Sequence, residues 1–213
     1  MWVSAAWAHG SASGALDTNL GPLVFIPAAV LFVLFLVFMH RRKGWVVLVA
    51  GGAGAIGGVL VPKLLKRRHR AVVLDLYPDS DPHGDGVFED IRNHVRLRQV
   101  KGDIADDAAV REALKGCDAV INLAPVNDDA LAPFVRAAKQ AGVRRFIHAL
   151  PENGSSENPE KILADERGPG FVTCVVEFGE SPPADVDSMA DHFLFLLAQP
   201  DARIAERSKK PRF

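Results

Sequence analysis

The stretch that decides the fold is Trp45-Val-Val-Leu-Val-Ala-Gly-Gly-Ala-Gly-Ala-Ile-Gly57. Its first six residues form an uninterrupted apolar run rich in β-branched side chains, which is typical of a strand buried on both faces of a parallel sheet. Glycines follow at once, and apolar residues then recur at helical spacing from Ile56 to Arg67. A strand, a glycine loop and a helix in this order present bare backbone N–H groups and the positive end of a helix dipole. The stretch therefore predicts a turn that binds phosphate.

A second buried strand, residues 71–75, ends in the carboxylate of Asp75, 18 residues after Gly57. At that separation an acid reaches the ribose of an adenine dinucleotide, so the two features together predict a dinucleotide fold. A carboxylate that accepts bonds from both ribose hydroxyls repels a 2′-phosphate, and we therefore expect NAD(H) in preference to NADP(H). In the alternative, the glycine turn serves helix packing alone and no cofactor is bound.

The alternation of strands and helices continues along the chain. Further strands are predicted at residues 95–100, 119–124, 145–150 and 171–176, and helices at residues 108–115, 131–141 and 185–199. Strands separated by helical stretches imply an α/β fold with a doubly wound, parallel, Rossmann-type sheet, whose ligands bind at the carboxyl ends of the strands.

The N-terminal fifth of the chain has a different composition. Residues 18–40 contain no Asp, Glu, Lys or Arg, and about 20 apolar residues suffice to cross a bilayer. A cleaved signal peptide is disfavoured because residues 1–10 contain no Lys or Arg. The basic residues directly after the span predict that the C-terminal part is cytoplasmic. The predicted organisation is a short extracytoplasmic N-terminus (1–19), a transmembrane helix (20–40), the nucleotide-binding domain (44–200) and a basic tail (201–213).

Composition excludes several classes of function. The chain has 25 Lys and Arg against 26 Asp and Glu, a net charge of −1, which argues against nucleic acid as a partner. Its two cysteines, Cys117 and Cys174, form neither a disulfide framework nor a zinc-ligand spacing. The alternating run Asp79-x-Asp81-x-His83-x-Asp85 lacks the Glu that closes a calcium loop. We therefore expect no metal site.

The same residues resemble the short-chain dehydrogenase/reductase superfamily, in particular its extended and atypical branches, which include sugar-nucleotide epimerases and NmrA-like proteins. Residues 50–57 resemble the Thr-Gly-x-x-Gly-x-x-Gly motif of that family, with Ala50 in place of Thr. Gly102-Asp103-Ile104 resembles the pair that faces adenine, and residues 120–124 resemble the strand that borders the nicotinamide ribose. The cofactor-binding residues that the resemblance implies are Gly51, Gly54, Ala55, Ile56, Gly57, Asp75, Asp103, Ile104, Leu123 and Ala124.

The catalytic half departs from the family pattern. Where the family carries a Ser after the fifth strand, this chain has Leu150-Pro151. Lys161-x-x-Ala-Asp resembles the end of the family's Tyr-x-x-x-Lys helix, which puts Glu157 at the position of the Tyr. A Glu titrates several pH units below a Tyr, so Tyr-dependent hydride transfer is not expected.

These observations favour a membrane-anchored, NAD(P)-binding but non-catalytic protein, an accessory, assembly or structural subunit of a complex in the bacterial inner membrane. Its expected partners are the lipid bilayer and other membrane-protein subunits. One alternative is a nucleotide-dependent reductase or sugar-nucleotide epimerase that uses Glu157 or Lys161. In another, the anchor is the functional part, and its helix packs into a larger assembly.

Overall fold

The computed structural model describes residues 30–32, 44–77, 88–151, 154, 156, 158–179, 185–201 and 204. The chain divides into two units, Met1–Arg42 and Lys43–Phe213. In the first unit residues 30–32 are helical, and the rest of the predicted span, residues 20–40, lies outside the described residues, as do residues 1–19 and most of 201–213. Within the described part of the chain, no helix has both the length and the apolar character that a membrane crossing requires.

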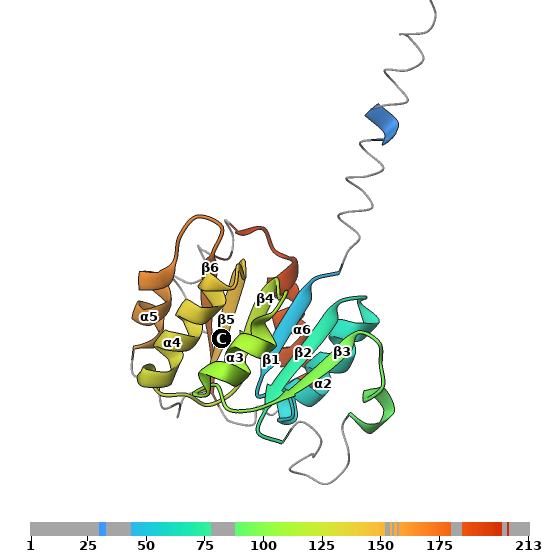
Figure 1. Cartoon of the computed structure of the whole chain (residues 1–213), viewed down its shortest axis with the longest axis horizontal. Coiled ribbons are helices and arrows are strands. Elements are labelled where there is room, and N and C mark those ends of the chain that lie inside the picture. Colours follow the sequence, from blue (N-terminus) through green and yellow to red (C-terminus); the bar gives the residue numbers. More distant parts are fainter. Residues whose placement is uncertain are drawn as a thin grey trace, which may run out of the picture. The chain divides into compact units, whose positions relative to one another are not determined.

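The second unit is built on six parallel strands in the order β3-β2-β1-β4-β5-β6 (Figure 1). The order reverses beside β1, so β2 and β4 flank the strand that opens the sequence motif. A parallel sheet of this kind has its binding crevice at that switch point. The strands are β1 (Val46–Ala50), β2 (Arg70–Asp75), β3 (Leu97–Lys101), β4 (Ala119–Asn122), β5 (Arg145–Pro151) and β6 (Val172–Phe178).

Helices cover both faces of the sheet, as the α/β prediction requires (Figure 1). One face is packed by α2 (Ala55–Lys66) and α6 (Val186–Ala198), which bury Leu60, Leu64, Phe193 and other apolar side chains against the strands. The opposite face is packed by α3 (Asp107–Leu114), α4 (Asp128–Gln140) and α5 (Pro159–Glu166). A short 3₁₀ turn, η2 (Glu89–Ile91), precedes β3. The predicted doubly wound sheet is confirmed.

Element boundaries differ from the predicted ones in two informative places. The third strand begins at Leu97, not at Val95, whose side chain is 88% exposed in the turn before the strand. The helix predicted from Leu131 begins at Asp128, because Asn127 caps it by accepting a bond from the N–H of Ala130 (3.0 Å).

A buried guanidinium, that of Arg145 at the start of β5, joins the amino end of the sheet to the end of α6. Arg145, 2% exposed, donates to the carbonyl oxygens of Leu196 (2.9 Å) and Leu197 (2.8 Å) at the end of α6. Trp45, just before β1, lies against two guanidinium groups, with the Cζ atoms of Arg144 and Arg145 at 4.7 and 4.8 Å from its ring centroid. Positive charge at a helix C-terminus complements the dipole, so this arrangement fixes α6 to the sheet.

Candidate functional site

The glycine loop connects the carboxyl end of β1 to α2, beside the end of β4. The N–H of Leu123 donates to the carbonyl of Ala50 (2.9 Å), and Gly51 turns the chain with φ of +72°. A Cβ on Gly51 would lie 2.7 Å from the backbone nitrogen of Ala124. Close approach of two strand ends therefore requires glycine at residue 51, and it places Leu123 and Ala124 next to the loop.

Two further glycines of the motif differ in what surrounds them. A Cβ on Gly57 would lie 2.3 Å from the carbonyl oxygen of Gly52, so the packing of α2 on the loop excludes a side chain there. A Cβ on Gly54 would meet only the carbonyl oxygen of Gly51, at 3.4 Å, and Gly54 has an ordinary φ of −75°. Neither packing nor backbone conformation requires glycine at residue 54. With no other atom within 4 Å of that position, its bare backbone leaves room for a pyrophosphate group to approach.

The N-terminus of α2, next to Gly54, has a positive electrostatic potential that no capping or acidic side chain of its own first turn offsets. Gly54 is the N-cap and offers no side chain to the helix, and the first turn contains no acidic residue. The first intrahelical bond runs from the N–H of Gly58 to the carbonyl of Gly54 (2.8 Å), so the N–H groups of Ala55, Ile56 and Gly57 precede it. By contrast α3, α4 and α6 carry Asp or Asn caps that accept backbone N–H bonds. The helix end beside Gly54 is thus suited to an anion.

Asp75, at the end of β2, closes the second side of the crevice. Its Oδ2 accepts a bond from the N–H of Ala53 (3.0 Å), inside the glycine loop, and its Oδ1 accepts one from the N–H of Tyr77 (3.0 Å). The predicted acid and the predicted loop are therefore in direct contact. Each carboxylate oxygen keeps a lone pair for a further donor, such as a ribose hydroxyl.

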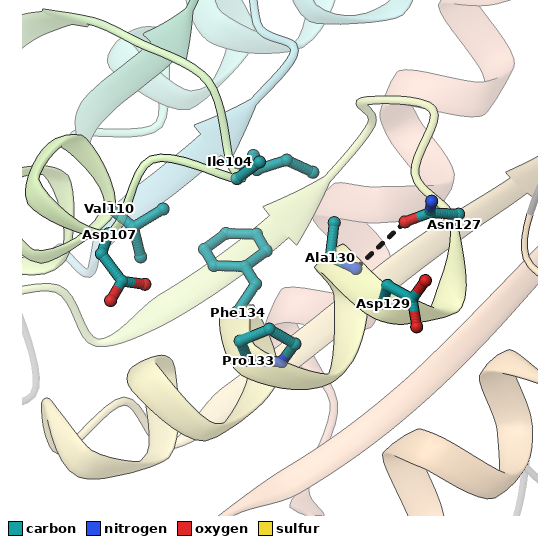
Figure 2. Close-up of a pocket in the computed structure, with 9 residues that line it drawn as sticks. Ile104, Asp107, Val110, Asn127, Asp129, Ala130, Pro133 and Phe134 are labelled. Carbon is teal, nitrogen blue, oxygen red and sulfur yellow. Dashed lines mark hydrogen bonds between the residues drawn. The ribbon is translucent and has the colours of Figure 1, made fainter.

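The loop after β3, the start of α3 and the start of α4 line a pocket (Figure 2). The N–H of Gly102 donates to the carbonyl of Asp75 (2.9 Å), which places Asp103 and Ile104 beside the end of β2. The Oδ1 atom of Asp103 accepts a hydrogen bond from the N–H of Ala105 (3.0 Å), which stabilises the turn after β3. The pocket has a volume of about 290 Å³. It is lined by Ile104, Ala105, Asp107, Val110, Asn127, Asp129, Ala130, Pro133 and Phe134.

Figure 2 shows the ring of Phe134 facing the pocket between Val110 and Ala130, with Ile104 above it. The carboxylates of Asp107 and Asp129 lie on opposite sides of the pocket. Apolar side chains at the centre with a few polar groups at the rim are the usual pattern of a small-molecule site. Of the lining residues, only Ile104 was predicted as part of a site. Ala105 lies in the loop before α3, Asn127 caps α4, and the remaining lining residues lie in the first two turns of α3 and α4.

A buried polar pair lies on the sheet under α4. Asn122 and His148 are neighbours in the β4–β5 register, and the Nδ2 group of Asn122 donates to Nδ1 of His148 (3.1 Å). The Oδ1 atom of Asn122 accepts from the N–H of Ala124 (3.2 Å), which fixes the amide. Nδ1 of His148 is thus an acceptor, so the ring proton is on Nε2, which is buried and has no partner among the described residues. Burial lowers the pKa of His148 to about 4, against a smaller opposite effect of Asp128.

The structure describes some, but not all, of the positions that were expected to carry catalysis. β5 ends in Leu150 and Pro151, as predicted, and Lys161 lies exposed on α5. Glu157 lies outside the described residues. Ser156 is buried and donates from Oγ to Asp128, which also accepts from the N–H of Asn158 (3.2 Å). Asp128 therefore fastens the loop before α5 to the start of α4.

The other side-chain clusters have structural partners. Asp187 and Asp191 of α6 pair with Lys63 of α2, at 2.8 and 2.9 Å, and hold the two helices together. Cys117 and Cys174 are both buried, and neither is in a disulfide. Where the structure describes the chain, no three His, Cys, Asp or Glu residues are grouped as metal ligands would be, and the run from Asp79 to Asp85 lies outside that part.

Comparison with known proteins agrees with this geometry. The sequence model of the NAD(P)H-binding family matches residues 51–150. A 3-beta-hydroxysteroid dehydrogenase from Mycolicibacterium neoaurum is 28% identical over 58% of this chain. Cinnamoyl-CoA reductase 1 from Petunia hybrida is 33% identical over 51%. The aligned regions are 36% of each relative, so the chain spans about a third of the length of the curated relatives it matches.

Solved structures share the fold. A wide-type short-chain dehydrogenase/reductase from Veillonella parvula DSM 2008, in complex with NADP, superposes with a TM-score of 0.60 at 11% identity, covering 75% of this chain and 90% of its own. The dTDP-glucose 4,6-dehydratase DesIV from Streptomyces venezuelae, with NAD bound, has a TM-score of 0.52 at 22% identity, covering 62% and 55%. Residues 51–150 are thus similar to the NAD(P)H-binding family, and the fold is the one seen in short-chain dehydrogenase/reductase and sugar-nucleotide dehydratase structures.

Proposed function

We propose that this protein binds NAD(H) in its Rossmann domain and acts, anchored to a membrane, as an accessory subunit without Tyr-dependent hydride transfer. The observation that carries the binding part is Gly54. A side chain at this helix N-terminus, which has no side-chain cap, would meet only the carbonyl oxygen of Gly51 at 3.4 Å, which supports a glycine that serves a ligand and not the fold. The pyrophosphate would bind to the N–H groups of Ala55 and Ile56.

Asp75 supports NAD(H) over NADP(H). Its carboxylate is held by the N–H of Ala53 at the edge of the loop, where the adenosine ribose of the cofactor would bind. A 2′-phosphate there would place further negative charge against a fixed carboxylate. The pocket of Figure 2 supplies apolar walls for an adenine ring, with Ile104 on the side of Asp75.

The residues at the catalytic positions support a non-catalytic role. The chain has one tyrosine, Tyr77, which follows β2 and is exposed, away from the end of β5. Leu150 and Pro151 offer no hydroxyl where β5 ends. A bound nicotinamide can exchange hydride, but these side chains provide no general acid of suitable pKa for a carbonyl substrate.

The anchor is supported by the sequence of residues 20–40 and by the basic residues that follow it. We place the domain on the cytoplasmic side of a bacterial inner membrane. A single span joined to a domain without catalytic hydroxyls suits assembly with other membrane subunits.

The test uses the full chain in lipid nanodiscs, titrated with NADH and NADPH while nicotinamide fluorescence is followed. We expect saturable binding of NADH and weaker binding of NADPH, and no loss of affinity in the control variant Gly168→Ala, whose new Cβ meets no atom within 4 Å. Absence of binding to both dinucleotides would leave the glycine turn with a packing role alone. Release of the chain from membranes by alkaline carbonate would refute the anchor independently.

A second candidate function is favoured by the curated relatives, whose names are those of a dehydrogenase and a reductase. Such an enzyme would use Lys161 or Glu157 in place of the missing Tyr. Turnover of NADH with carbonyl or sugar-nucleotide substrates that disappears in Lys161→Ala and Glu157→Gln, while NADH binding persists, would establish this function and overturn the accessory role.

A further inference from the structure

The amino ends of the parallel strands carry an unusual concentration of positive charge. The segments that precede the six strands, residues 44–45, 67–70, 92–96, 115–118, 141–144 and 167–171, contain eight Lys and Arg residues and one Asp. The eight are Arg67, Arg68, Arg70, Arg92, Arg96, Lys115, Arg144 and Arg167. We call this end of the sheet the amino-end face.

Backbone bonds join these segments side by side. The N–H of Arg70 donates to the carbonyl of Trp45 (2.9 Å), and the N–H of Ala71 donates to that of Arg96 (2.9 Å). Asp118, the one acid, already accepts from the N–H of Val46 (2.9 Å) and pairs with Arg144 (3.1 Å). Arg67 and Lys115 also pair with acids of the neighbouring helices, Asp191 (3.5 Å) and Glu112. These three acids are fewer than the eight basic residues, so the face keeps a net positive charge.

Helix ends explain only part of this charge. Arg67, Lys115 and Arg167 are C-caps, where positive charge complements a helix dipole. Arg70 opens β2, and Arg92 and Arg96 lie in the turn before β3, so the dipole argument does not cover them. Arg68 follows the end of α2 with φ of +66°, a conformation that favours glycine.

The opposite end of the sheet has the opposite charge. The described segments that follow strands, residues 51–54, 75–77, 101–107 and 123–129, contain six Asp residues and one Lys. The loops at the two ends of the sheet thus differ in charge, and the positive loops lie at the end at which β1 begins.

We propose that the amino-end face rests on the anionic lipid surface of the membrane, with the cofactor crevice turned toward the aqueous phase. This inference rests on the membrane anchor of the proposed function. Five residues lie between His40, at the end of the predicted span, and Val46 in β1, so the six steps of the chain reach at most about 20 Å. Attraction of Lys and Arg to an anionic bilayer falls off within a Debye length, about 8 Å at physiological ionic strength. The tether therefore lets this end of the domain approach the bilayer to within the range of the attraction.

Two apolar side chains of the face fit an interface with lipid. Val95 is 88% exposed at the tip of the turn between Arg92 and Arg96. Trp45 is partly exposed beside Arg144. Trp and exposed apolar residues flanked by Arg are favoured at the depth of lipid headgroups.

The test measures distance from the membrane by energy transfer. The full chain carries a donor dye on Val95→Cys, or, for comparison, on Pro125→Cys at the acidic end, and the acceptor is on headgroups of nanodisc lipids. The native cysteines do not compete for dye because both are buried and burial raises the pKa of Cys117 to about 11. Discs contain either phosphatidylcholine alone or phosphatidylcholine with phosphatidylglycerol.

We expect greater transfer from residue 95 than from residue 125 in discs with phosphatidylglycerol. The excess should be lost in pure phosphatidylcholine, in 1 M salt (where the Debye length is about 3 Å), and in the double variant Arg68→Glu/Arg70→Glu. The matched variant Arg111→Glu/Arg136→Glu makes the same change of net charge on the helices and should retain the excess. Both pairs of residues are exposed, and NADH titration verifies that the variants are folded.

Transfer from residue 95 that is equal in the two kinds of disc would overturn the proposal. So would an equal loss in the two double variants, or a crosslink from residue 95 to a protein in native membranes, which would assign the face to a partner subunit. Carbonate extraction separates this failure from failure of the anchor, because a chain that stays in the membrane but ignores lipid charge refutes only the lipid contact.

Discussion

Replacing Gly54 by Ala tests whether residue 54 is a glycine because a ligand approaches it or because the fold requires it. The new Cβ would meet only the carbonyl oxygen of Gly51, at 3.4 Å, so the fold can accept it. Because residue 54 is the N-cap of α2, where Ala is a poor cap, the loss of stability should be at most about 1 kcal/mol. The methyl group would, however, stand where a pyrophosphate must approach backbone N–H groups. Losing one hydrogen bond to a charged group weakens binding by about 1.5–3 kcal/mol, or roughly tenfold to a hundredfold in Kd.

The comparison with Gly57→Ala makes the result interpretable. In a helix interior Ala is normally better than Gly by about 1 kcal/mol. Here its Cβ would lie 2.3 Å from the carbonyl oxygen of Gly52, so overpacking should destabilise the domain by about 1–3 kcal/mol. Urea unfolding of the full chain in detergent measures stability, and NADH titration measures affinity. If Gly54→Ala binds NADH as tightly as the parent chain, the assignment of open space at residue 54 to the pyrophosphate is wrong.

Four further substitutions test other parts of the structure. Asp75→Asn keeps an acceptor for the N–H of Ala53 but removes the charge, so the preference for NADH over NADPH should fall about tenfold in parallel titrations, at roughly 1.4 kcal/mol for one lost charge repulsion. The folded-state pKa of His148, about 4, lies below its ordinary value of 6.5, so the unfolded state binds the proton first. Stability should therefore fall by about 3 kcal/mol as pH decreases from 6.5 to 4, and His148→Gln should remove that part of the slope in urea titrations. Arg145→Lys should cost about 2–3 kcal/mol of unfolding free energy, because the single nitrogen of Lys cannot replace both guanidinium nitrogens, one of which binds the carbonyls of Leu196 and Leu197 and the other that of Gln199 (3.0 Å). Arg68→Gly should raise the melting temperature by relieving φ of +66°, worth about 0.5–1 kcal/mol, while it reduces transfer from residue 95 to anionic lipid.

The sheet could be predicted because buried parallel strands are continuous apolar runs and their helices have a different period. The glycine loop and Asp75 could be predicted because one short segment of sequence contains both the loop and the strand that ends in the acid, the two parts of a dinucleotide-binding motif. The strand at 95–100 was placed too early because the turn at His94 and Val95 carries no Gly, Pro or Asp-Gly signal. The early start of α4 had a visible signal, since Asn127 followed by two Asp residues is a typical helix start.

Contacts between distant strands could not be predicted in the same way. The pairing of Asn122 with His148 depends on the register of β4 and β5, across 26 residues of sequence, and the apolar patterns of the two strands do not fix that register. The capping of α6 by Arg145 spans 51 residues and lies at the end of the sheet away from the crevice. An Arg that opens a buried strand is nevertheless a usable signal, because a guanidinium 2% exposed must find carbonyl or carboxylate acceptors nearby.

The distance between the two ends of the sheet also limits which residues a partner subunit must contact in order to respond to the cofactor. A parallel sheet places every loop that can touch the cofactor at the carboxyl ends of the strands, and places the entry of the chain into β1 at the other end. Five residues of β1, at about 3.3 Å each, lie between the two ends. A subunit that reads whether NAD(H) is bound must therefore contact the acidic end, near Asp103 and Asp129. Crosslinks from these two positions that change when NADH is added would identify a sensing partner, whereas a purely structural partner would give none that depend on NADH.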